Sequence, residues 1–437
     1  MKNPFGSPQQ SSRRPQPDGN ADSRLCSMFL SAFLAAAIGL SAPVHAETPS
    51  ACATPGNWID VKTGKAINRG DLYRDVVAKP SVVLLGEYHT DVDHHRWQLQ
   101  TLAALHGRGG NVVIGFEAFP RRLQAVLDDW VDGKLTDDAF LKASEWRQVW
   151  GYDPGLYMPL FQFARLNRVP MIALNVERKL VSQVGQQGWE NVPAAEREGL
   201  SDPAPASEAY QRELARVYLL KKSLPPGTDP LSVGAGANPK EPDDAAISDA
   251  IKQPEFQRFV AAQLTWDRAM AEALAGARRK WPDATVVGIL GAGHVENGYG
   301  VPHQLQALGV ADVKSFLPAS IDAACTQAAG AADAVFTLPH EDDTPAPERP
   351  RLGVLLTDGD GAPRISRVVN DSVADTAGLK AGDQVVRAAG LSIRTPDELV
   401  EVVGRQAPGT WLPLGIRRDG QEIDIVARFP PRPRPER

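Results

Sequence analysis

The residues best suited to chemistry lie in one short stretch, EYHTDVDHH, which runs from Glu87 to His95. It brings carboxylates and three imidazoles close together, and both groups serve as general acids, general bases and metal ligands. Asp91 and Asp93 stand where a helix is expected to begin, so the helix dipole is enough to explain them. No such explanation applies to Glu87 and His89, which we therefore treat as candidate site residues.

Short apolar runs must position these side chains. Residues 81–86, SVVLLG, directly precede the stretch and are long enough for a strand buried on both faces. Residues 111–119 form a second such run and contain Glu117, and residues 284–290 form a third, which leads to His294. Since these runs alternate with helical patterns, we predict an α/β fold with a mainly parallel sheet and covering helices. Ligands in such sheets bind at the carboxyl ends of strands, where these polar residues are expected to meet.

Two interpretations of this set stay open. A divalent metal held by His89, His294 and the carboxylate of Glu87 or Glu117 would leave a position for water, as in hydrolytic sites. In that case Glu87 or Glu117 would be the general base. The structural alternative is that glutamates and histidines at strand ends hydrogen-bond one another and cap helices.

An aromatic-rich segment follows the second apolar run and contains Trp146, Trp150, Tyr152 and Tyr157. We interpret the tryptophans as packing residues. A tyrosine can also ligate haem iron, and aromatic side chains suit the face of a porphyrin, so the segment is also compatible with haem.

Composition and the N-terminal residues restrict the setting. The chain has 437 residues with a formal net charge of −6, which argues against a nucleic-acid partner. Residues 1–46 join an apolar segment to a small-residue site and predict a cleaved signal peptide, hence a periplasmic or secreted protein. Cys52 and Cys325 then remain, and whether they form a disulfide stays open.

Five motifs carry a family resemblance. They are GEYHTDVDHH, FEAF, GYDPGLYMPLFQFAR, QLTWDRAMA and GAGHVENGYGVP, in this order. The chain resembles the ChaN-like haem-binding family, which shares a superfamily with the Tiki and TraB type proteins and the erythromycin esterases. The family implies a haem-binding domain, expected here over residues 52–340, that uses a tyrosine as axial ligand, forms a homodimer and takes part in haem uptake or iron homeostasis.

The resemblance also suggests residue roles. Tyr157 is the leading axial ligand, with Tyr88, Tyr152 and Tyr299 as the other candidates. The expected contacts for the haem propionates are His94, His95 and Lys179. The wider superfamily implies metal-dependent hydrolysis instead, and Glu87, His89 and His294 match its motif positions.

A second domain follows a proline-rich linker at residues 341–350. Residues 351–430 resemble a PDZ domain, a small β-barrel-like fold with two helices, and residues 431–437 are expected to be a disordered tail. Leu352, Gly353 and Val354 resemble the loop that captures the carboxylate of a peptide or protein C-terminus. Haem binding is the favoured function, with a metallohydrolase or a noncatalytic PDZ scaffold as alternatives.

Overall fold

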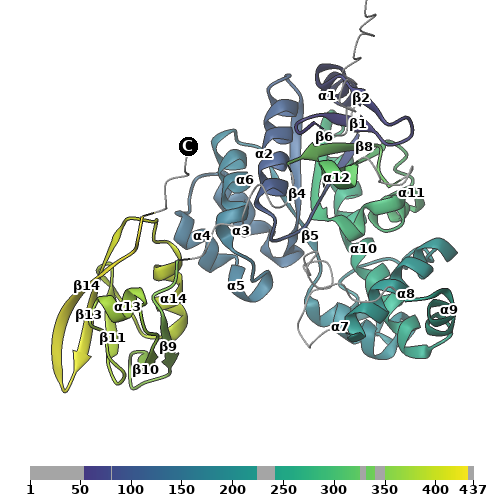
Figure 1. The fold of residues 1–437 in the computed structure, drawn as a ribbon. Helices are drawn as coiled ribbons and strands as arrows, with labels where there is room; N and C mark the ends of the chain where they lie inside the picture. The colour runs from purple at the N-terminus through teal and green to yellow at the C-terminus, as the bar shows by residue number, and fades with distance from the viewer. Residues whose placement is uncertain (1–53, 80, 224–241, 325–330, 340–349, 432–437) are drawn as a thin grey trace, which may run out of the picture. The chain divides into compact units, whose positions relative to one another are not determined.

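The computed structural model describes residues 54–79, 81–223, 242–324, 331–339 and 350–431 (Figure 1). The predicted signal peptide, both Cys52 and Cys325, most of the linker and most of the tail lie outside these residues. The signal peptide and the disulfide therefore stay predictions.

An eight-stranded sheet forms the centre of the first domain, in the order β2-β1-β8-β7-β3-β6-β4-β5. The pairs from β8 to β5 are parallel, whereas β1 pairs antiparallel with both β2 and β8. The predicted mainly parallel sheet is confirmed. Its strands are β1 (Trp58–Asp60), β2 (Lys65–Ile67), β3 (Val82–Glu87), β4 (Asn111–Pro120), β5 (Met171–Asn175), β6 (Ala284–Gly291), β7 (Val313–Ser320) and β8 (Ala334–Leu338).

Helices cover both faces of the sheet because its central strands are apolar on both sides. In β3, Val83 and Leu85 belong to the hydrophobic cluster of α2 and α6, while Val82 and Leu84 belong to that of α10 and α11. Among the described residues, no helix is long and apolar enough to cross a membrane. The helices of this domain are α1 (Arg69–Ala78), α2 (Val92–His106), α3 (Gln124–Val131), α4 (Asp137–Ala143), α5 (Trp146–Val149), α6 (Pro154–Leu166), α7 (Arg178–Gln187), α8 (Glu208–Ser223), α9 (Asp244–Ile251), α10 (Pro254–Lys280), α11 (Val301–Ala307) and α12 (Ile321–Ala324).

Strand register determines which side chains meet at the carboxyl edge. The parallel pairing of β3 with β6 ends with Glu87 opposite Gly291, and β4 flanks β6 on its other side. The chain leaves β6 through a short 3-10 helix, Ala292–His294. The ends of three adjacent strands therefore bring Glu87, Glu117 and His294 to the same edge.

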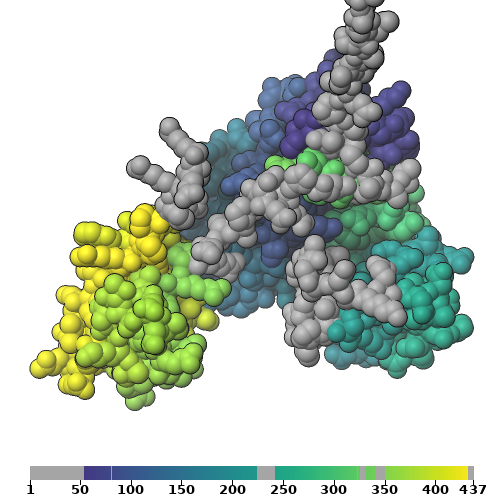
Figure 2. Space-filling model, in the orientation of Figure 1, coloured from purple at the N-terminus to yellow at the C-terminus, as the bar shows by residue number. Residues whose placement is uncertain are grey.

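Residues 350–431 contain an antiparallel sheet and their own hydrophobic core. Figure 2 shows these residues, coloured light green to yellow, as a compact body. The strand order is β14-β13-β11-β10-β9, and β12 pairs with β11. The predicted second small domain with two helices is confirmed. Its elements are β9 (Val354–Thr357), β10 (Arg364–Val368), α13 (Val373–Thr376), β11 (Gln384–Ala388), β12 (Leu391–Ser392), α14 (Pro396–Gly404), β13 (Trp411–Arg418) and β14 (Gln421–Arg428).

Candidate functional site

The junction of β3 and α2 sets the first part of the site. Asp91 is the N-cap of α2, because its side chain accepts hydrogen bonds from the backbone N–H groups of Asp93 (2.8 Å) and His94 (3.2 Å). The helix therefore starts only a few residues after Glu87. This places His95 and Gln98, in the first two turns of the helix, against the end of the strand.

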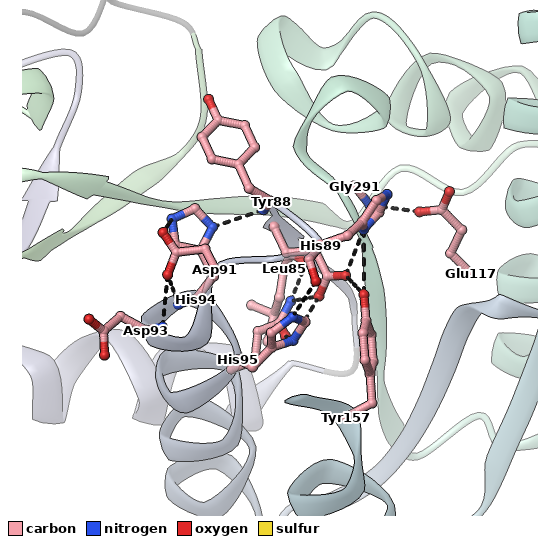
Figure 3. Close-up of polar contacts among 12 residues, drawn as sticks. Leu85, Tyr88, His89, Asp91, Asp93, His94, His95, Glu117, Tyr157 and Gly291 are labelled. Atoms are coloured by element: carbon pink, nitrogen blue, oxygen red, sulfur yellow. Dashed lines mark hydrogen bonds and ion pairs between the residues drawn. The ribbon is translucent and has the colours of Figure 1, made fainter. Parts of the chain in front are cut away.

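Glu87 is buried at the centre of a polar cluster that includes His89, His95 and Tyr157, which are labelled in Figure 3. Its Oε1 accepts hydrogen bonds from His89 Nδ1 (2.9 Å) and from the hydroxyl of Tyr157. Its Oε2 accepts one from Gln98 Nε2 (2.8 Å) and lies 3.3 Å from His95 Nδ1. Both oxygens of Glu87 are thus engaged by neighbouring side chains.

The charge state of this cluster follows from its contacts. Burial alone would raise the pKa of Glu87. The charge of His95 and the hydrogen bonds from His89 and Tyr157 lower this pKa by more than burial raises it, so the carboxylate stays ionised at neutral pH. Burial alone would lower the pKa of His89. Its hydrogen bond to Glu87 and the charge of Glu117 outweigh burial, so the pKa of His89 lies above its ordinary value. Burial and the nearby Glu87 raise the pKa of Tyr157 well above its ordinary value, so its hydroxyl keeps its proton and donates.

Glu117 and His294 form a second buried cluster. Glu117 Oε2 accepts a hydrogen bond from the backbone N–H of Gly291 (2.7 Å), and its Oε1 lies 3.5 Å from His294 Nε2. The other imidazole nitrogen, His294 Nδ1, lies 2.6 Å from Asp267 Oδ1. Burial opposes charge on Glu117, but the charge of His294 outweighs it and holds the pKa of Glu117 at about 2. Burial likewise lowers the pKa of His294, but Glu117 and Asp267 raise it to about 10.

The two clusters meet at Gly291. A Cβ atom at this position would lie 3.0 Å from His89 Cε1, which is too close without a small shift, and 3.6 Å from Glu117 Oε2, which is an ordinary contact. The structure thus brings together the four residues Glu87, His89, Glu117 and His294, as predicted from the strand ends.

The donor atoms do not form an evident metal site. Within the described ranges, no group of three His, Cys, Asp or Glu side chains is arranged so that it could hold a metal ion. Glu87 and Glu117 instead accept hydrogen bonds from protein groups, while His89 and His294 each pair through Nδ1 with a carboxylate. The geometry gives no support to Glu87, His89 and His294 as a ready-made ligand set.

The candidate tyrosines differ in exposure. Tyr157 is only 1% exposed and its hydroxyl is bonded to Glu87, so its position does not support the expectation that it is the leading axial ligand. Tyr88 is 40% exposed, and its ring stacks on His94 with centroids 5.1 Å apart. Figure 3 shows the ring of Tyr88 directed away from His95 and Tyr157. Tyr152 is half-buried against His89, and Tyr299 packs on a tyrosine of α8.

The residues expected to contact the haem propionates also differ in exposure. His94 and His95 are buried: His94 Nδ1 accepts a hydrogen bond from the backbone N–H of Tyr88 (2.9 Å), and His95 Nε2 lies 3.2 Å from the carbonyl oxygen of His89. Their polar atoms make internal contacts in this structure, and their role as propionate contacts stays a prediction. Lys179, in the first turn of α7, is exposed.

Three site residues were missed by sequence reasoning. Gln98 donates to Glu87, Asp267 contacts His294, and Tyr210 donates to Asp267 (2.8 Å). One signal was available for Asp267, because a carboxylate among the apolar positions of a long helix needs a buried partner. Tyr210 gave no such signal, since a tyrosine on an apolar helix face is ordinary packing.

The loop before β9 lies close to the start of α13 and leads into an edge strand. Leu352 is buried, and its carbonyl accepts a hydrogen bond from the backbone N–H of Ala374 (2.8 Å). Gly353 has φ +84°, and a Cβ there would lie 2.2 Å from the Cβ of Ser372. Val354 then begins β9, which is an edge strand of the described sheet. An edge strand can accept a peptide as an additional strand.

The surface also has a hollow that lies away from the candidate site. A hollow of about 390 Å³ lies at the amino ends of β4 and β6, near Asn111, Arg168 and Trp281. This is the opposite edge of the sheet from Glu87 and Glu117. The chemistry-bearing residues and this hollow are therefore separate features.

Comparisons with known proteins identify both domains. Residues 74–305 match the family described as "Haem-binding uptake, Tiki superfamily, ChaN", and residues 350–427 match the PDZ domain family. A structure of ChaN of Campylobacter jejuni with cofacial haem binding is 18% identical and covers 64% of this chain and 95% of that chain, with a TM-score of 0.46. The HtrA-type protease AlgW with a decapeptide is 22% identical and covers 20% of this chain and 30% of that chain, with a TM-score of 0.18.

Two curated relatives match shorter parts of the chain. They are probable periplasmic serine endoproteases, DegP-like, from Hahella chejuensis (33% identical, 20% of this chain, 21% of the relative) and from a Marinomonas species (39% identical, 16% of this chain, 15% of the relative). The chain thus spans about a fifth or less of the length of these relatives. Because the match at residues 74–305 covers more than half of the 437 residues, this protein belongs to the ChaN haem-binding family of the Tiki superfamily and carries a C-terminal PDZ domain.

Proposed function

We propose that this protein binds haem at the carboxyl edge of its parallel sheet and acts in haem uptake or iron homeostasis in the periplasm. The observation that carries the proposal is the position of Tyr88 in a chain of this family. Tyr88 directly follows the end of β3, is 40% exposed and has its ring stacked on His94. A tyrosine could hold haem iron if its hydroxyl were accessible, and Tyr88 is more exposed than buried Tyr157.

The surroundings of this edge suit haem as well. His89 lies within ring contact of Trp150 (4.7 Å) and Tyr152 (5.0 Å), so aromatic side chains flank this histidine at the carboxyl edge. Lys179 is an exposed cation in the loop-to-helix region that follows β5, and a cation of this kind can pair with a propionate. Bound haem would supply iron chemistry, while the protein's own contribution is to hold the ring and its carboxylates.

The homodimer implied by the family resemblance is part of this proposal. Sedimentation velocity of the purified protein, with and without one equivalent of haemin, tests it. We expect the sedimentation coefficient to increase on addition of haemin, and a monomer under both conditions would remove the dimer from the proposal without affecting haem binding itself.

The proposal is tested by an absorption titration of the purified protein with haemin, combined with elemental analysis of the protein as isolated. A saturable Soret band and no stoichiometric transition metal is the expected result. A band that grows without saturation, as it does for haemin that associates nonspecifically, would contradict haem binding.

A metal-dependent hydrolase is the second candidate, and one observation favours it. The Glu87–His89 and Glu117–His294 pairs are buried and meet at Gly291, yet haem binding through Tyr88 does not need them. Buried ionised groups are costly, so their presence at a strand edge suggests a function. In this case stoichiometric metal is expected in the isolated protein, and Glu87→Gln and His294→Ala should each abolish turnover of a peptide or ester. Turnover that persists in both variants would exclude this site.

The PDZ domain and the location complete the proposal. We propose that the loop at Leu352, Gly353 and Val354 binds a peptide or protein C-terminus beside β9. A noncatalytic scaffold would show this binding with neither haem saturation nor turnover.

Export is tested by N-terminal sequencing of the protein recovered from the periplasm of an expressing bacterium. Cleavage after Ala46 is expected, and an intact Met1 would contradict it.

A further inference from the structure

A chain of buried polar contacts connects helix α8 to the carboxyl edge of the sheet. It runs from Tyr210 in α8, through Asp267 in α10, to His294 after β6 and then to Glu117 in β4. Haem binding at Tyr88 does not use these residues. Buried polar groups of this kind require an explanation, because each costs free energy unless its partners are in place.

Asp267 is the centre of the chain. Its side chain is 0% exposed, and each of its oxygens has a partner: Oδ1 lies 2.6 Å from His294 Nδ1, and Oδ2 accepts from the hydroxyl of Tyr210 at 2.8 Å. The backbone is closed around this contact. A Cβ at Gly300 would lie 3.0 Å from Asp267 Oδ1 and 2.7 Å from the carbonyl oxygen of His294, so a larger residue would displace one of them.

The short contact shows that Nδ1 of His294 carries a proton. An ionised carboxylate only accepts, so a distance of 2.6 Å to Nδ1 requires a proton on that nitrogen. Gln263 Nε2 also lies 3.1 Å from His294 Nδ1, but a protonated nitrogen cannot accept a bond from an amide. The shorter carboxylate contact therefore decides the arrangement, and Nε2 is left to face Glu117 Oε1 at 3.5 Å.

His89 shows the same arrangement on the other side of Gly291. Its Nδ1 is 2.9 Å from Glu87 Oε1, which leaves Nε2 near Gly291. A carboxylate that holds one nitrogen of a histidine fixes both the tautomer and the direction of the ring. The two histidines of the edge are thus held by two different carboxylates, Glu87 and Asp267.

We propose that Asp267 is a positioning residue, which Tyr210 holds in place from α8, and that it fixes His294 with Nδ1 protonated and Nε2 directed to the carboxyl edge beside Glu117. This assigns a role to two residues that neither the haem proposal nor the hydrolase candidate includes. It also connects the packing of α8 on α10 with the direction of a histidine at the edge. The inference does not depend on which ligand the edge accepts.

Nuclear magnetic resonance of the full chain, labelled with ¹⁵N-histidine and free of haemin, tests this proposal. The expected signal is a far-downfield proton bound to Nδ1 of His294, which His294→Gln removes and thereby assigns. Asp267→Asn should abolish this downfield resonance, and Tyr210→Phe should shift it, because the carboxylate then loses its second partner. A merely structural role would not move this signal selectively.

Tyr218→Phe is the matched control. Tyr218 lies on the same helix and is also buried, but its hydroxyl has no hydrogen-bond partner within the part of the chain that the structure describes. This variant should leave the resonance of His294 unchanged. The proposal is overturned if the wild-type protein carries the His294 proton on Nε2 alone, if the downfield signal survives in Asp267→Asn, or if both tyrosine variants shift it equally. The wild-type spectrum decides the first point even when a variant fails to fold, and none of the outcomes depends on haem.

Discussion

At the scale of single residues, Gly291 matters because it has no side chain, which leaves room for His89 beside the end of β6. A side chain here would press against His89 Cε1 at 3.0 Å, and the pairing of β3 with β6 leaves the backbone little room to move. We expect Gly291→Ala to lower the free energy of unfolding by about 1–3 kcal/mol, as overpacking does in closely packed regions.

Urea denaturation followed by tryptophan fluorescence measures this change, because eight of the nine tryptophans precede residue 350. Gly276→Ala is the matched control. Gly276 lies inside α10, and the nearest atom to its added Cβ is 3.8 Å away, so alanine should leave stability unchanged or raise it by up to about 1 kcal/mol. Equal effects of the two substitutions would show that the contact with His89 is unimportant.

The Glu117–His294 pair predicts how stability depends on pH. The pKa of Glu117 falls from 4.5 to about 2, so its contribution is present above pH 4.5 and is lost as the pH falls toward 2. The pKa of His294 rises from 6.5 to about 10, so its contribution is complete below pH 6.5 and is lost as the pH rises toward 10. The pair therefore stabilises most between pH 4.5 and 6.5.

Replacement of His294 should show this window directly. We expect the free energy of unfolding of the wild-type protein to exceed that of His294→Gln by up to a few kcal/mol, which is the order of free energy that corresponds to the pKa shift of His294. This difference should become smaller as the pH rises from 6.5 to 10. His303→Gln, at a partly exposed histidine in α11, is the control and is measured over the same pH range. A His294→Gln difference that stays constant over this range would contradict the assignment.

At the scale of elements, the junction of β3 and α2 sets the direction of the exposed tyrosine. Asp91 caps α2 through two backbone N–H groups and also lies 3.4 Å from His94 Nε2, on which Tyr88 stacks. We expect Asp91→Ala to lower the free energy of unfolding by about 1 kcal/mol, the usual cost of a lost N-cap. Tryptophan fluorescence in urea measures the change.

Asp93→Ala tests whether the cap itself is responsible. Asp93 is in the first turn of the same helix and pairs with Arg96 at 2.8 Å, a contact of an exposed arginine that contributes little to stability. We expect a change within about 0.5 kcal/mol. If Asp93→Ala cost as much as Asp91→Ala, helix-dipole charge rather than capping would explain the junction.

The elements also show what the sequence could predict. The convergence of Glu87, Glu117 and His294 was predictable, because apolar runs of strand length put their polar ends at one edge whenever the strands are parallel. The role of Asp91 was predictable for a similar local reason. The direction of Tyr157 was not, because α6 takes its orientation from packing around Trp146 and other aromatic residues, which no local pattern specifies.

Long-range contacts account for the remaining differences. Tyr210 and Asp267 are 57 positions apart in the chain and come together through the packing of α8 on α10. The exposure of Tyr88 and the burial of His94 and His95 likewise depend on how α2 lies on the sheet. The set of residue types at the edge was therefore readable from the sequence, while their pairing and exposure required the structure.

At the scale of the whole molecule, the chain combines a haem-binding family domain with a domain family that captures peptide ends. Each domain has its own hydrophobic core, so a change at the carboxyl edge of the first sheet should leave the loop at Gly353 intact. This allows the haem proposal to be tested in the full chain without loss of the second domain.

The most direct test compares two tyrosine variants, Tyr88→Phe and Tyr157→Phe, in an absorption titration with haemin. Both remove one hydroxyl, but Tyr88 is exposed and Tyr157 is buried with its hydroxyl bonded to Glu87. We predict that Tyr88→Phe loses the saturable Soret band and that Tyr157→Phe retains it despite some loss of stability. A band that survives in Tyr88→Phe and disappears in a folded Tyr157→Phe would contradict the account.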